Sequence, residues 1–77
     1  MPPTAATEQP PAVDEPKHPL YALTTYELRD YARQLTSAIA FFDRQDPVPP
    51  ARADLQTALD DVLAEQESRA RIAHARA

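Results

Sequence analysis

The chain has no cysteine and no glycine among its 77 residues. Without cysteine it can form no disulfide, no thiolate zinc site and no thiol nucleophile. Without glycine it has no Gly-rich loop to bind phosphate groups, and tight turns that need a positive φ lose their usual residue. These two absences exclude thiol enzymes, cysteine-based zinc fingers and Gly-rich nucleotide-binding loops.

Positive charge is also scarce, because 8 basic residues face 12 acidic ones and the net charge is −4. This balance opposes a general attraction to nucleic acid or anionic lipid, where contacts to phosphate supply much of the affinity. No apolar run approaches the length of a membrane span, and no secretory signal pattern opens the chain. We expect a cytoplasmic protein, and the Ala-, Arg- and Pro-rich usage without asparagine indicates a GC-rich bacterial source.

Proline is concentrated at the start of the chain, where residues 1–19 hold six of the nine prolines. Val13 is the single large aliphatic residue in this segment after Met1. Such a segment buries too little apolar surface to offset the entropy of ordering it. We therefore predict a disordered Pro-rich tail over 1–19, followed by a helical domain over 20–77.

A helix start is encoded at Thr24, because the run Thr24 to Glu27 fits the S/T-x-x-E capping box. The Thr24 hydroxyl would accept a hydrogen bond from the Glu27 amide, and the Glu27 carboxylate would accept one from the Thr24 amide. Leu23 and Leu28 occupy the matching hydrophobic staple positions. This predicts a first helix from 25 to about 45, which the three prolines between 47 and 50 would end.

Apolar residues then form a stripe on each of two helices. At about 100° per residue, those of the first helix fall within an arc of about 120°. Pro50 suits the start of a second helix, from 50 to about 73, which leaves a turn at 46–49. Helices joined by so short a turn run antiparallel, so the predicted fold is all-α, a coiled-coil-like two-helix hairpin. The predicted core or self-association residues are Leu28, Tyr31, Leu35, Ile39, Phe42, Leu55, Leu59, Val62 and Leu63.

Association is expected, because two helices share one contact line and leave each core side chain half covered. Small chains without disulfides commonly gain stability from a partner. We predict a homodimer that forms a four-helix bundle, with docking on another protein as the alternative arrangement. Aromatic and arginine side chains off the stripe are enriched at binding hot spots. They form the candidate partner surface: Tyr26, Arg33, Phe41 and Arg44.

Residues for catalysis or metal binding are few. His18 lies in the predicted tail and His74 near the C-terminus, and neither has a second histidine at ligand spacing. The adjacent Asp60 and Asp61 would point about 100° apart on a helix, so they cannot form a close carboxylate pair. We predict no enzymatic activity, no metal and no cofactor.

These observations favour a small regulatory or protein-interaction hairpin that acts by helix–helix docking on itself and on a protein partner. Two other functions stay open. One is an accessory subunit of a larger enzyme complex. The other is a dimeric nucleic-acid-binding regulator that uses the Arg-rich C-terminus around Arg69 and Arg71, although the net charge makes nucleic acid a partner we do not expect.

Overall fold

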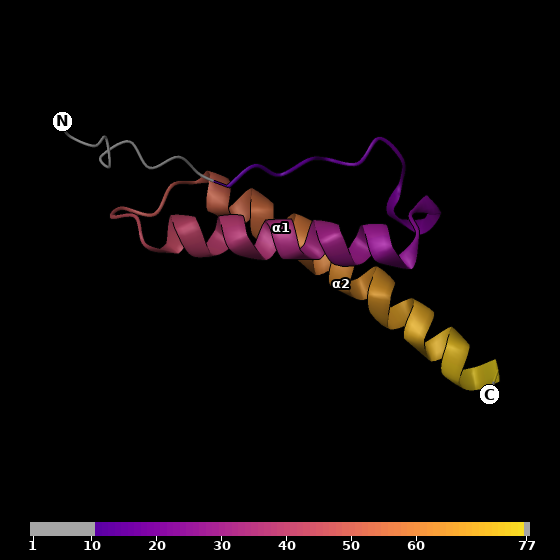
Figure 1. Cartoon of the computed structure of the whole chain (residues 1–77). Helices are drawn as coiled ribbons and strands as arrows, with labels where there is room; N and C mark the ends of the chain where they lie inside the picture. The colour runs from indigo at the N-terminus through magenta and orange to yellow at the C-terminus, as the bar shows by residue number, and fades with distance from the viewer. Residues whose placement is uncertain (1–10, 77) are drawn as a thin grey trace.

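The computed structural model describes residues 11–76, with side chains as far as Ala75. Within this range the chain forms a short 3-10 helix, η2 (Leu20–Ala22), and two α-helices, α1 (Thr25–Asp43) and α2 (Ala51–Arg76). Figure 1 shows that α1 and α2 pack together and run in opposite directions. The prediction of an all-α helical hairpin is confirmed. The predicted disorder of residues 1–10 lies outside the described residues.

The start of α1 is fixed by hydrogen bonds between Thr24 and Glu27. The Thr24 Oγ1 accepts from the Glu27 amide at 3.0 Å, and the Thr24 amide donates to the Glu27 Oε1 at 2.8 Å. These are the two bonds of the capping box, and they satisfy amides that a helix start otherwise leaves without a partner. Leu23, the residue before the cap, is 5% exposed and belongs to the core. The chain therefore enters α1 at an angle fixed by both polar and apolar contacts.

At the end of α1, just before the prolines, the backbone hydrogen bonds change from a four-residue to a three-residue spacing. The amides of Arg44 and Gln45 donate to the carbonyls of Phe41 and Phe42, three residues back, at 3.2 and 2.9 Å. Bonds of this kind satisfy carbonyl groups at a helix end. The prolines that follow cannot continue the ladder, so α1 ends two residues before the predicted limit of about 45.

The beginning of α2 is tied back to α1 by an ion pair. Arg52 Nε donates to Asp43 Oδ1 at 2.8 Å. Pro50 lies directly before the first residue of α2, and its carbonyl accepts from the Ala53 amide at 3.1 Å. At its other end α2 extends past the predicted limit of about 73, to Arg76.

The core lies along the line where α1 faces α2. Leu28 and Val62 are fully buried and Leu35 is 1% exposed, and together with Leu23 they form one cluster. Since Leu35 and Val62 lie near the middle of their helices, they are the centre of the hairpin. Eight of the nine predicted core residues are buried or half-buried: Leu28, Tyr31, Leu35, Ile39, Phe42, Leu55, Leu59 and Val62.

Leu63 is the exception. The prediction that it lies in the hairpin core is wrong. Its side chain is 48% exposed. Val62 occupies the position that faces α1, and the next residue along a helix is rotated by about 100°. Leu63 therefore points to one side of the hairpin, where its predicted role in self-association stays a prediction.

The two helices differ in length. α2 has 26 residues and α1 has 19, so at about 1.5 Å per residue α2 is about 10 Å longer. Figure 1 shows the last turns of α2 projecting beyond the first turn of α1. We call these projecting turns, from about residue 70 onwards, the overhang.

Arg69 holds η2 against α2 at the base of the overhang. Its Nη2 donates to the carbonyls of Leu20 and Tyr21 at 3.1 and 3.3 Å, and its Nε donates to Glu65 Oε2 at 2.9 Å. A guanidinium carries five N–H donors in a planar fork, so one side chain can serve all three acceptors. We call this set of contacts the Arg69 clasp.

Residues 11–19, here called the strap, have no helix or strand but make defined contacts. Figure 1 shows the strap running alongside α1 in the opposite direction. The Asp14 amide donates to Gln34 Oε1 at 2.7 Å, and the half-buried Val13 packs against the core cluster. The described part of the predicted tail therefore forms a third layer on one side of the hairpin.

Candidate functional site

The strap occupies one of the two grooves between the helices. Side chains from strap, α1 and α2 surround an open hollow of about 280 Å³. Burial raises the pKa of the Tyr31 hydroxyl, and the Glu15 carboxylate of the strap raises it further. The residues that line this hollow are Glu15, Pro16, His18, Pro19, Leu20, Tyr31, Ala58 and Asp61.

The strap hollow brings together the titratable groups Glu15, His18 and Asp61. Within residues 11–76, however, no three histidine or acidic side chains gather closely enough to hold a metal ion. The hollow is open to solvent, whereas groups that catalyse by proton transfer work best where water is excluded. The strap side of the hairpin is therefore a poor candidate for a chemical site.

Among the described residues 11–76, none covers the groove on the opposite side in this way. Thr25 and Arg29 of α1 and Gln66 and Ala70 of α2 border a hollow of about 380 Å³ that no strap residue lines. A second hollow, of about 420 Å³, follows on α2. It is lined by Asp60, Leu63, Ala64 and Glu67. We call this side of the hairpin the open face, and it is the candidate functional site.

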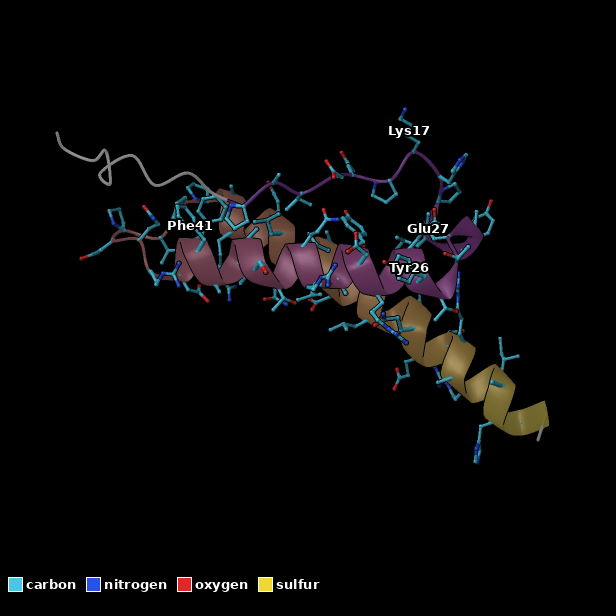
Figure 2. All side chains as sticks on the ribbon, in the orientation of Figure 1. Lys17, Tyr26, Glu27 and Phe41 are labelled. Carbon is cyan, nitrogen blue, oxygen red and sulfur yellow. The ribbon has the colours of Figure 1, made fainter. Side chains whose placement is uncertain are left out.

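Most of the predicted partner surface lies on the outer side of α1, next to the open face. Tyr26 is 75% exposed and the Arg33 side chain is 75% exposed, with an ion pair to Asp30. Tyr26, Arg29 and Arg33 line one small hollow together (Figure 2 labels Tyr26). Arg44 is also exposed, but it lies at the far end of the helix and lines none of the hollows described here.

The prediction that Phe41 belongs to the partner surface is wrong, because its side chain is only 7% exposed. It lies two helical turns after Gln34, so it shares the α1 face along which the strap runs. Figure 2 places it on the strap side of α1. Its ring also packs edge-on against Phe42, with centroids 5.5 Å apart and an angle of 74°.

The capping carboxylate gives α1 a testable pH dependence. The hydrogen bonds from the Thr24 amide and hydroxyl hold the pKa of Glu27 below its ordinary value of 4.5. A carboxylate with a lowered pKa stabilises the fold above its ordinary pKa, and that contribution is lost as the pH falls through the lowered value. The difference in unfolding free energy between the natural chain and Glu27→Ala should therefore be constant near pH 7 and shrink below pH 4.5. Urea unfolding at several pH values measures it, and an unchanged difference at low pH would contradict the cap assignment.

Arg69 has a structural role that sequence reasoning missed. The sequence assigns Arg69 to a basic C-terminal cluster with Arg71. In the structure its guanidinium donates hydrogen bonds to the carbonyls of Leu20 and Tyr21 and to the Glu65 carboxylate. The sequence signal for the Glu65 pair was the i, i+4 spacing. Nothing in the sequence pointed to two backbone carbonyls 48 and 49 residues away.

Comparison of the chain with protein-family models, with curated proteins and with solved structures found no match. Over the described residues, neither helix combines the length and the apolar character needed to cross a membrane. The open face and its residues are therefore the basis for a functional proposal.

Proposed function

We infer that the chain is a small protein-interaction module, without catalysis, that works by docking its helices on another protein surface. The observation that carries this proposal is the open face, where Leu63 is 48% exposed in the middle of α2. A single exposed leucine is ordinary on a protein surface. Here it lines one of two hollows, on the side of the hairpin that no strap residue covers within residues 11–76.

Burial of this face on a partner would be favourable in a chain with a small core. Covering apolar surface contributes about 25 cal/mol per Å² removed from water. Ile72 is 56% exposed in the overhang, but it lies nine residues after Leu63, about 180° around α2, so it adds nothing to the open face. A helix pair with a free side and a projecting end suits docking on a second helical surface.

The nucleic-acid alternative has less support. Arg69 is already bonded within the chain, and the open face carries Asp60 and Glu67, which would repel phosphate. The accessory-subunit alternative would use the same surface, with an enzyme as the partner.

Photo-crosslinking from position 63 tests the proposal. Replacing Leu63 with a benzophenone amino acid in cells that make the protein should give a covalent adduct with a protein on irradiation. Thr57 is a matched control, because it is also exposed on α2 but lies on a different face of the helix. An adduct from 63 and none from 57 is the expected result. No adduct from 63, or equal yields at both positions, would exclude docking through the open face.

A further inference from the structure

We propose that the open face binds the open face of a second copy of this chain, with α1 of each copy lying on α2 of the other. This rests on the proposed docking function and names its partner. The inference depends on the signs of the charges along the two helices and on their relative register.

The α1 side of the open face carries a basic row. Arg29 borders the groove between the helices and shares a hollow with Arg33 and Tyr26. Arg33 is paired with Asp30, but its five donors and its exposure leave it able to bind a further acceptor. This row therefore offers two guanidinium groups to a partner. Tyr26 also lines a hollow with Asp14 and Pro16 of the strap, so it lies between the strap and the open face.

The α2 side carries an acidic row. Asp60 and Glu67 flank Leu63 at three residues before and four residues after it, and all three line the same hollow. Residues at these spacings lie on one face of a helix. Glu67 lies 4.0 Å from Arg71 and Asp60 accepts from Gln56, but both carboxylates are exposed, so a partner that covers Leu63 must place its own polar groups beside them.

The contacts within the hairpin fix which parts of the two rows lie at the same level. Asp43 pairs with Arg52 at the turn. Counting equal steps away from this pair along the antiparallel helices brings Arg33 level with Val62, beside Leu63. Arg29 and Gln66 line one hollow, which agrees with this register.

A two-fold axis that runs parallel to the helices, just outside the open face, then brings opposite charges together. Rotation by 180° about this axis puts α1 of the second copy on α2 of the first. The level of each residue along the axis is unchanged, so Arg33 of one copy comes to lie near Leu63 of the other, between Asp60 and Glu67. Because the interface is two-fold, the same contacts form a second time with the copies exchanged.

A second copy fits this face better than a partner of one charge sign. A uniformly acidic surface would be repelled by the α2 row, and a uniformly basic one by the α1 row. Complementary patches of both signs on one face set the orientation of an interface and suppress other partners. The other copy carries both rows in the arrangement required.

Light scattering over a range of concentrations, with circular dichroism as a check on folding, tests the proposal on the full chain. The natural protein should reach twice its chain mass of 8.6 kDa. Arg33→Glu and Asp60→Arg should each weaken the dimer about tenfold or more, because each substitution acts at two symmetric places. The double variant should bind more tightly than either single one, because the opposite charges meet again.

Asp61→Arg is the matched control for Asp60→Arg. It makes the same charge change one residue away, but Asp61 lines the strap hollow on the other side of α2. Its dimer should stay within about threefold of the natural one, less than half a unit in log Kd. A mass of one chain at every concentration, a double variant no tighter than the singles, or equal losses for the Asp60 and Asp61 variants would each overturn the proposal.

The two proposals fail differently. A monomer that still gives an adduct with another protein from position 63 would exclude self-association and leave docking in place. A monomer that gives no adduct at all would exclude both. An adduct of twice the chain mass, together with rescue by the double variant, supports both.

Discussion

Replacing Leu35 with aspartate should abolish the helical fold. Leu35 is 1% exposed at the centre of the hairpin, where it belongs to the same core cluster as the fully buried Val62. Truncation of a buried leucine alone costs about 2–5 kcal/mol. A carboxylate in the same position has no partner and adds the cost of removing its charge from water. A chain with so few fully buried side chains has little stability to lose, so the circular dichroism spectrum should lose its helical bands.

Ser37→Asp is the control for this experiment. It introduces the same charge into α1, two residues further along, but Ser37 is exposed. Surface substitutions of this kind usually change stability by about 0.5 kcal/mol or less. A helical spectrum for Leu35→Asp that matches the Ser37 control would contradict the assignment of the core.

Removing residues 1–16 should lower the unfolding free energy by about 1–3 kcal/mol while both helices remain. The truncation deletes Val13, which packs on the core cluster, and the hydrogen bond from the Asp14 amide to Gln34. It also uncovers the α1 face that carries the buried Phe41. Urea unfolding followed by circular dichroism measures the loss.

A pair of point variants separates specific packing from a general effect of the segment. Val13→Asp places a charge on a half-buried position, and Ala12→Asp places it on the exposed neighbour. Val13→Asp should lose stability and Ala12→Asp should not. If the truncated chain and both variants unfold at the same urea concentration as the natural protein, the strap contributes nothing to the fold.

Much of the hairpin could be predicted from the sequence, because its signals are local. The capping box depends on residues three apart, and the end of α1 depends on prolines a few residues away. The apolar period identified which stripe of α1 is buried. Each of these features is decided by neighbours along the chain.

What the sequence did not reveal depends on contacts between distant residues. The buried Phe41 lies on the α1 face along which the strap runs, and composition alone assigns that segment to a disordered tail. Leu63 fitted a broad apolar stripe, and only the orientation of α2 against α1 showed that Val62 takes the central position. The position of the open face depends on the path of the strap, because the strap could have covered either groove.

The Arg69 clasp also has a consequence for the order in which the hairpin assembles. It joins residues 48 and 49 positions apart, whereas the Asp43–Arg52 pair at the turn joins residues nine apart. Closing the longer loop from an open chain costs about 1.5 kcal/mol more by the logarithmic length rule. The contacts between α1 and α2 would therefore form first next to the proline turn and then progress away from it. The Arg69 clasp would form last, once the packing of α1 on α2 has brought η2 close to Arg69. The same end would be the first to open, so the chain comes apart from the overhang and leaves the turn as its most persistent contact.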